Sequence, residues 1–207
     1  MCGVSMLLLV GLGNPGREYA SHRHNVGFMA VDELARRAKA DAFREKFSGE
    51  YARGELLDEQ LIFLKPMTYM NESGRSVQAA MTFFKVPPKD VIVLHDELDL
   101  PFGDVRLKMS GGHAGHNGLR SIMAVMGPDF GRLRLGIGRP PAGFRGEIAD
   151  YVLSSFDAVE RATLPDVIKT GGDTVLDVIR RGFEAAMNAR NTRPKPPKKP
   201  KEPPPAA

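Results

Sequence analysis

The stretch Gly11-Leu-Gly-Asn-Pro-Gly-Arg-Glu-Tyr-Ala-Ser-His-Arg-His-Asn25 directly follows an apolar run at residues 6–10. A short apolar run that ends at Gly and Pro indicates a buried strand followed by a tight loop. Apolar residues then recur at helical spacing from Phe28 onward, so the stretch predicts a strand, a loop and a helix. Ligands of open α/β sheets gather at the carboxyl ends of strands, which makes the polar residues of this loop candidates for chemistry.

The rest of the chain alternates strand-like and helix-like segments. A buried apolar run predicts a strand at residues 91–94, alternation predicts strands at 105–109 and 132–138, and a hairpin is expected from 51–57 and 60–64. Apolar residues three or four apart predict helices at 26–40, 73–85 and 119–126, and again from 156 to about 189. We therefore expect a single α/β domain over residues 6–190, in which helices flank a twisted, mixed and largely parallel sheet and the last helices form a C-terminal cover.

The composition favours a globular protein of a reducing compartment. With 207 residues and 42% apolar content, the chain can bury one core. The single cysteine, Cys2, excludes an internal disulfide and a cysteine metal cluster, so a cytoplasmic protein is expected. No apolar run reaches membrane-spanning length, and residues 7–10 are too few for the core of a signal peptide, so no membrane partner is expected.

The net positive charge lies near the C-terminus. Five of the 29 Lys and Arg residues and one of the 25 Asp and Glu residues follow Asn191, which leaves 24 of each for the rest of the chain. Seven prolines lie between residues 191 and 207, and such a composition cannot form a core. We expect a disordered Pro/Lys-rich tail at 191–207 and a disordered extension at 1–5. Any site for a polyanion on the domain must then be a local patch.

Polar residues collect in the expected loops. The five histidines occupy three of these loops, as His22 and His24, His95, and His113 and His116. The loops after the strands also carry Asn14, Asn25, Asn71, Asp96 and Asn117. Each Asn or Asp alone could serve as a helix cap or a turn residue. Because the loops follow strands of one sheet, their convergence on a functional cleft is the better interpretation.

Metal-free hydrolysis is the first chemical interpretation. A histidine, with an ordinary pKa of about 6.5, suits a general base that takes a proton from water, and a nearby carboxylate fixes its tautomer. His24 with Asp96 fits this description. The amides of Asn14, Asn71 and Asn117 can donate hydrogen bonds to a developing oxyanion. No serine or cysteine nucleophile motif is present.

Two other chemical interpretations are weaker. Zinc could be bound by ligand types found in these loops, namely His22, His24, His95, Asp96, His113 and His116, but the familiar zinc motifs are missing. The segment from Gly11 to Gly16 matches the Gly-x-Gly-x-x-Gly pattern of dinucleotide-binding folds. In that pattern the helix begins within the motif, whereas here Pro15 and several further residues intervene.

Basic residues flank the glycine-rich segment at 110–118. They are Lys108, Arg132, Arg134 and Arg139 on or near strands, with Arg120 on the following helix. Strand alternation puts Arg132 and Arg134 on the same face. This pattern supports a phosphate site and ordinary solvated strand charge about equally.

Four separated motifs together resemble one family. They are Gly11–Gly16 with Tyr19 and Arg23-His24-Asn25, then Lys65-Pro66 to Met70-Asn71-Glu72-Ser73-Gly74, then His95-Asp96-Glu97-Leu98-Asp99, and then Gly111 to Leu119. In this order they are similar to the signatures of bacterial peptidyl-tRNA hydrolases, from about residue 6 to about residue 189. The resemblance implies a monomeric α/β enzyme, without a metal or other cofactor, that cleaves the ester joining a peptide to the 3′ ribose of tRNA.

The resemblance also implies roles for single residues. His24 is the implied general base, Asp96 its orienting partner and Asn14 a catalytic amide. The implied substrate-binding residues are Tyr19, Asn25, Met70, Asn71, His116 and Asn117. Lys108 and Arg134 match positions that clamp the 5′ phosphate at the acceptor end of tRNA. His22 departs from the family pattern, which usually has threonine or another small residue there.

A non-catalytic alternative uses the same fold. Relatives of this fold can serve as RNA-binding splicing factors, which would keep a basic face and need no general base. Because the chain has both His24 and Asp96, we expect the enzyme, which would release free tRNA for reuse in translation.

Overall fold

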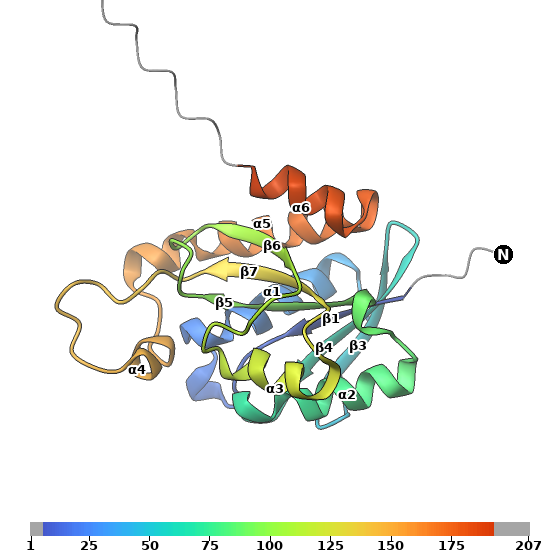
Figure 1. The fold of residues 1–207 in the computed structure, drawn as a ribbon, viewed down its shortest axis with the longest axis horizontal. Helices are drawn as coiled ribbons and strands as arrows, with labels where there is room; N and C mark the ends of the chain where they lie inside the picture. The colour runs from blue at the N-terminus through green and yellow to red at the C-terminus, as the bar shows by residue number, and fades with distance from the viewer. Residues whose placement is uncertain (1–5, 193–207) are drawn as a thin grey trace, which may run out of the picture.

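A seven-stranded sheet forms the centre of the protein (Figure 1). The structure is a computed structural model and describes residues 6–192. The strand order is β2-β3-β4-β1-β5-β7-β6. The parallel strands are β1 (Met6–Gly11), β4 (Glu59–Pro66), β5 (Val91–Glu97) and β7 (Gly131–Gly136), and the antiparallel ones are β2 (Arg44–Lys46), β3 (Gly49–Leu56) and β6 (Val105–Met109). The expected mixed, largely parallel sheet is confirmed.

Helices cover both faces of this sheet (Figure 1). One face carries α1 (Val26–Arg37), α5 (Ala158–Arg181) and α6 (Phe183–Asn191), and the other carries α2 (Ser73–Phe84) and α3 (Asn117–Met126). The short α4 (Ile148–Val152) follows β7, and 3₁₀ turns lie at Arg17–Tyr19, Arg23–Asn25, Met70–Glu72 and Pro88–Asp90. The packing of α5 and α6 on the core provides the expected C-terminal cover.

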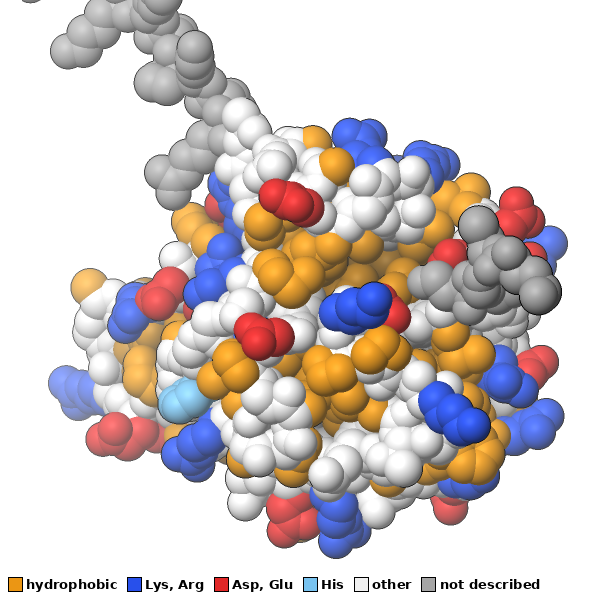
Figure 2. Space-filling view, turned by 45° about the vertical axis from the view of Figure 1, so that its right-hand side comes forward, with side chains coloured by type: hydrophobic (Ala, Val, Ile, Leu, Met, Phe, Trp, Pro, Cys, Tyr) orange, Lys and Arg blue, Asp and Glu red, His pale blue; other side chains and the backbone are white. Residues whose placement is uncertain are grey.

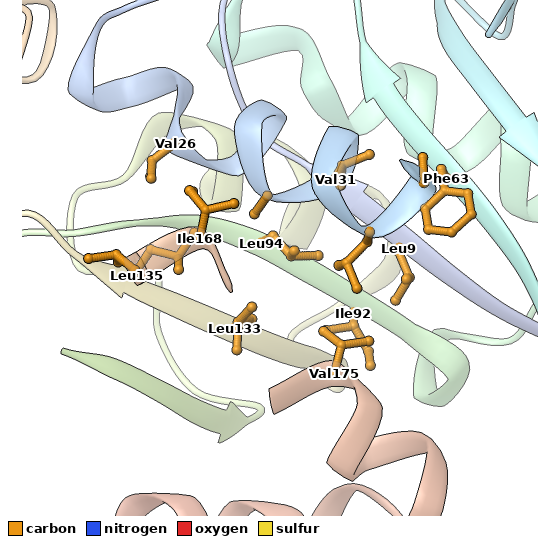
Figure 3. Close-up of a cluster of buried hydrophobic side chains, with 14 of the residues drawn as sticks. Leu9, Val26, Val31, Phe63, Ile92, Leu94, Leu133, Leu135, Ile168 and Val175 are labelled. Carbon is orange, nitrogen blue, oxygen red and sulfur yellow. The ribbon is translucent and has the colours of Figure 1, made fainter. Parts of the chain in front are cut away.

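The central strands are buried on both faces. In β1, Leu8, Leu9 and Val10 are fully shielded from solvent. Successive side chains of a strand alternate, so Leu9 joins the core under α1 and α5, whereas Leu8 and Val10 join the core under α2 and α3. Figure 3 shows the first of these cores, where Ile92 of β5 lies close to Val175 of α5.

Some element bounds differ from those predicted. The helix expected over 26–40 ends at Arg37, because the chain turns through a left-handed conformation at Lys39, with φ 46°. The helix expected from 119 begins two residues earlier, where the His116 side chain caps it. The strand expected at 132–138 runs from Gly131 to Gly136.

Two elements were not expected. Strand β2 has three exposed, charged residues, so its sequence carries no apolar signal, and it forms by pairing with β3. Helix α4 is short, and a capping box between Glu147 and Asp150 starts it.

The edge strand β6 is closed by the end of α6. The side-chain amide of Asn191 donates to Leu107 O at 2.7 Å and accepts from Leu107 N at 3.0 Å, as a neighbouring strand would. Asn191, which the sequence placed in the tail, is therefore part of the domain. The rest of the expected tail, from residue 193, and the expected extension at 1–5 lie outside the described residues. Within residues 6–192, no helix is long and apolar enough to cross a bilayer.

Candidate active site

Glycines bring the first loop close to the sheet. A Cβ atom on Gly27, near the start of α1, would lie 2.3 Å from Leu94 O of β5 and 2.5 Å from Leu12 N. A Cβ atom on Gly11 would lie 2.5 Å from Gly27 O. Helix α1 therefore begins directly against the carboxyl ends of β1 and β5, and the turn before it holds His24 there.

His24 and Asp96 form the predicted pair. His24 Nδ1 lies 2.8 Å from Asp96 Oδ1, and because a carboxylate only accepts, Nδ1 is the donor. Burial acts to lower the pKa of His24, but the Asp96 carboxylate outweighs it and raises the pKa above 6.5. Burial also opposes ionisation of Asp96, yet His24 and His116 hold the pKa of that carboxyl well below its ordinary value. The His24 Nε2 lone pair is thus available as a base.

A second histidine uses the same carboxylate oxygen. His116 Nε2 lies 3.0 Å from Asp96 Oδ1, while His116 Nδ1 accepts from Gly118 N at 3.1 Å and Leu119 N at 3.4 Å. Backbone N–H groups only donate, so the proton of neutral His116 must be on Nε2. His116 therefore caps α3 and joins this helix to Asp96.

His95 lies buried behind these groups. Its Nδ1 donates to the Asp96 carbonyl oxygen at 2.7 Å, and its ring lies edge-on to that of His116, with the centroids 5.1 Å apart. Burial, together with His116, lowers the pKa of His95 to about 3. His95 is therefore neutral at physiological pH and supports the backbone of Asp96.

Asn14 is held by two neighbours. Its Oδ1 accepts from Met70 N at 3.0 Å. Asn25 Oδ1 accepts from Asn14 N at 3.0 Å, and Asn25 Nδ2 donates to Asn14 O at 2.9 Å. With Oδ1 engaged by Met70, the amide is oriented and the Asn14 Nδ2 group is the end left to donate to a ligand.

A cavity of about 390 Å³ opens at the carboxyl ends of β1 and β5. It is lined by six of the predicted site residues, which are Asn14, His24, Met70, Asp96, His116 and Asn117. These residues come from four segments that are far apart in the sequence, with Asp96 at the end of β5 and Asn117 at the start of α3. The predicted convergence of the loops therefore holds in the structure.

Three predicted substrate-binding residues do not line this cavity. Asn25 is buried and contacts the backbone of Asn14. Tyr19 packs edge-on to His22, with ring centroids 5.4 Å apart. Asn71 is exposed in the turn that follows Met70. Of the three, Asn25 is hydrogen-bonded to a residue that lines the cavity, Asn14.

The basic residues of β6 and β7 divide into two kinds. Lys108 and Arg134 are partly exposed, and Arg134 Nη1 lies 3.7 Å from Glu97 Oε2. Arg132 is buried and donates to backbone carbonyl groups, so its guanidinium does not reach solvent. Lys, Arg, Asp and Glu side chains are interspersed on the face in Figure 2, without one large basic field. A phosphate site on this face would be local.

Comparisons with known proteins agree with this geometry. A family model described as peptidyl-tRNA hydrolase matches residues 8–199. The chain belongs to the peptidyl-tRNA hydrolase family. It is 73% identical over 188 residues to a peptidyl-tRNA hydrolase of Sorangium cellulosum, covering 90% of this chain and 84% of that relative. It is 55% identical over 168 residues to that of Methylorubrum populi, covering 81% and 79%.

A solved structure of the family has the same fold. The crystal structure of peptidyl-tRNA hydrolase from Acinetobacter baumannii matches with a TM-score of 0.84 at 39% sequence identity, covering 91% of this chain and 96% of that chain. The predicted resemblance to this family is confirmed.

Sequence reasoning missed one wall of the cavity in this family member. Ile148, Ala149, Val152 and Leu153, in and just after α4, form this wall. Ile148 is 45% exposed and Leu153 is 38% exposed, so the wall is apolar and open to solvent. Ile148 with Val152, and Ala149 with Leu153, are apolar pairs four residues apart, and this spacing could have predicted a helix here.

Sequence reasoning also missed the role of Arg23. This arginine is buried, stacks 4.5 Å from the ring centre of Tyr151, and donates to Ser154 Oγ at 2.8 Å. It also forms an ion pair with Glu160 of α5. Arg23 thereby ties the loop that carries His24 to the segment that forms the apolar wall.

The two alternative interpretations of the site find little support. His24, Asp96 and His116 offer atoms within 4.8 Å of one another, which is compatible in distance with a metal ion. A metal ion there would compete with the hydrogen bonds that His24 Nδ1 and His116 Nε2 make to Asp96. Helix α1 begins only at Val26, and Gly11 serves close packing, so the first motif does not form a dinucleotide site.

Proposed function

We propose that the protein hydrolyses the ester bond between peptide and tRNA in peptidyl-tRNA and releases free tRNA for reuse in translation. The observation that carries this proposal is the His24–Asp96 hydrogen bond, in a cavity that Asn14 also lines. Membership of the peptidyl-tRNA hydrolase family supports the choice of substrate.

His24 is the general base of the proposed reaction. Its Nε2 takes a proton from a water molecule, whose oxygen attacks the ester carbonyl carbon. Asp96, on Nδ1, fixes the tautomer and stabilises the imidazolium that forms. The Asn14 Nδ2 group donates to the developing oxyanion. When the tetrahedral intermediate collapses, the imidazolium returns the proton to the 3′ oxygen of the ribose, which leaves.

The simplicity of this machinery suits an ester. A ribose oxygen is a much better leaving group than an amide nitrogen, so one base and a few donors suffice without a covalent intermediate or a metal ion. Free peptides should therefore be poor substrates.

Substrate recognition is proposed to use two regions. Met70, Asn117 and His116 line the cavity and bind the reacting end of the substrate. Asn71 and Tyr19 contact the substrate outside the cavity, and Asn25 acts through Asn14.

The second region is the clamp on strands β6 and β7. Lys108 and Arg134 bind the 5′ phosphate at the acceptor end of tRNA, because phosphate favours exposed cations that can donate several hydrogen bonds. The enzyme is proposed to act as a monomer in the cytoplasm, where its substrate is made. A chain with a single cysteine suits that reducing compartment.

A non-catalytic RNA-binding role is not favoured. Such a role needs the basic residues of β6 and β7 but gives no reason for burying an ionised carboxylate between His24 and His116. Burying a charged carboxylate costs free energy, and a role of Asp96 in the reaction gives a reason for that cost.

The test is single-turnover hydrolysis of N-acetyl-aminoacyl-tRNA. We expect wild-type activity to persist in EDTA, and His24→Ala to lose at least about a hundredfold in rate, the usual contribution of a general base. His22→Ala is the matched control, since it removes a histidine of the same loop that does not line the cavity.

Each component of the proposal can fail separately. Loss of wild-type activity in EDTA would show that the clustered histidines are metal ligands. Binding of the tRNA without cleavage would identify a non-catalytic relative. Equal losses in His24→Ala and His22→Ala would point to damage of the loop, and the base would have to be sought elsewhere.

A further inference from the structure

Arg132 is a buried cation near the start of β7. It is 2% exposed, and its guanidinium lies 4.8 Å from the ring centre of Phe130. Among residues 6–192 it forms no ion pair with a carboxylate, because its hydrogen bonds to oxygen go to carbonyl groups. Burial, with Arg134 nearby, lowers the pKa of Arg132, but a guanidinium stays charged at neutral pH. Such a charge is costly to bury, so its contacts are informative.

These contacts hold the start of the glycine-rich loop. Arg132 Nη1 donates to Gly112 O at 2.6 Å, and Arg132 Nη2 donates to Gly111 O. The two nitrogen atoms of the planar fork thus fix two successive peptide groups. A lysine lacks this fixed geometry, since its three donors share one nitrogen atom on a flexible stem.

The loop in turn supports Lys108. Gly111 has φ +95°, and a Cβ atom placed on it would lie 2.9 Å from Lys108 Cε and 3.1 Å from Lys108 Nζ. The lysine side chain therefore runs along the backbone of Gly111. Lys108 and Arg132 are also directly opposite each other in the pairing of β6 with β7. Arg132 thus holds the Gly111 carbonyl group by a hydrogen bond, and the Gly111 backbone lies against the Lys108 side chain.

We propose that Arg132 is a positioning residue for recognition of the 5′ phosphate of tRNA. It touches no phosphate itself. By holding Gly111 and Gly112, Arg132 fixes the position of the Lys108 ammonium group. Without the Arg132 guanidinium, we expect the backbone at Gly111 and Gly112 to shift and Lys108 to lose its fixed position. This inference rests on the proposed function, which assigns Lys108 to the phosphate.

The test compares two substrates on each enzyme preparation. One is N-acetyl-aminoacyl-tRNA with its 5′ phosphate, and the other is the same tRNA after the phosphate has been removed. The measured quantity is the ratio of kcat/KM for the two substrates. Because the ratio is taken within one preparation, a change in the amount of folded enzyme cancels.

We expect the ratio to fall about tenfold in Lys108→Ala, as for the loss of one charge-assisted hydrogen bond. The ratio should fall to a similar value in Arg132→Met. It should also fall in Arg132→Lys, which keeps the charge but lacks the fork. In the double variant with Lys108→Ala and Arg132→Met, the ratio should be no lower than in either single variant, because both substitutions remove the same contact with the phosphate.

The control is Arg36→Met, which removes an exposed arginine of α1 and should keep the wild-type ratio. If Arg132→Met does not fold, Arg132→Lys, which keeps the charge, tests the role of the fork by itself. A wild-type ratio in Arg132→Lys would overturn the proposal, since charge alone would then suffice.

Failure of the inference can be told from failure of the proposed function. If wild type hydrolyses both substrates equally, the phosphate clamp itself is wrong and the role of Arg132 falls with it. If wild type and Lys108→Ala behave as expected while both Arg132 variants keep the wild-type ratio, only the inference about Arg132 is wrong.

Discussion

Asn25 brackets the backbone of Asn14 with both ends of its side-chain amide. Asn25 Oδ1 accepts from Asn14 N at 3.0 Å, and Asn25 Nδ2 donates to Asn14 O at 2.9 Å. Asn25 is 3% exposed and does not line the cavity. We therefore expect any effect of Asn25 on catalysis to pass through the position of Asn14.

The first prediction concerns this bracket. In Asn25→Asp, the carboxylate still accepts from Asn14 N but repels Asn14 O, so Asn14 shifts away from the oxyanion. We expect kcat to fall by about ten- to a hundredfold, as for small misplacements of catalytic groups, with KM for tRNA little changed. Single-turnover and steady-state hydrolysis would measure this. Asn188→Asp, an exposed change on α6, should behave as wild type; a raised KM with unchanged kcat would instead show that Asn25 binds substrate directly.

The second prediction concerns pH. A base must be neutral to act, so activity should rise with pH through the pKa of His24, and because Asp96 raises that pKa, the midpoint should lie above 6.5. Asp96 Oδ1 accepts from both His24 and His116, so an asparagine oxygen in Asp96→Asn can keep both hydrogen bonds without the charge. Burial then acts unopposed and lowers the pKa of His24.

Rate profiles of kcat/KM against pH would test this. In Asp96→Asn we expect the midpoint to fall below 6.5, and the rate to fall by about a hundredfold or more because the imidazolium is no longer stabilised. A midpoint that does not move would mean that the titrating group is not His24.

The sequence predicted the strand, loop and helix at its start because each signal there is local. An apolar run stopped by Gly and Pro and the helical spacing after Phe28 do not depend on the rest of the chain. The convergence of His24 and Asp96 could also be predicted, since parallel strands deliver their carboxyl ends to one edge of the sheet. Asn117 follows the antiparallel strand β6, so this argument does not explain its position.

The remaining features depend on where side chains point. Asn25 and Asn71 have the same residue type and similar positions before helices, yet one is buried against Asn14 and the other is exposed. Alternation correctly put Arg132 and Arg134 on one face, but it could not show that only Arg132 is covered by the glycine-rich loop. Strand β2 escaped prediction because its residues bury no apolar surface.

The third prediction concerns the contact between α1 and the sheet. In Gly27→Ala, the added Cβ atom would meet backbone atoms of Leu94 and Leu12, which cannot move aside as a flexible side chain could. We expect the free energy of unfolding to fall by about 3 kcal/mol or more, as for severe overpacking. Urea unfolding would measure this. Gly112→Ala is the control for stability, since a Cβ there meets no atom within 4 Å, and its change should stay within about 0.5 kcal/mol.

The fourth prediction separates Asn191 from the residues that follow it. In Asn191→Ala, the buried Leu107 N–H and C=O groups at the edge of β6 lose their partners, and we expect the free energy of unfolding to fall by about 1–3 kcal/mol. Asn188→Ala, on the same helix but without such bonds, should leave stability unchanged. Removing residues 193–207, which carry five of the basic residues, should leave stability unchanged and kcat/KM within about twofold of wild type at moderate salt. A large loss of turnover in this truncated protein would show that the basic segment takes part in catalysis. Loss of a purely electrostatic attraction for tRNA would instead raise KM, mainly at low salt, and leave kcat unchanged.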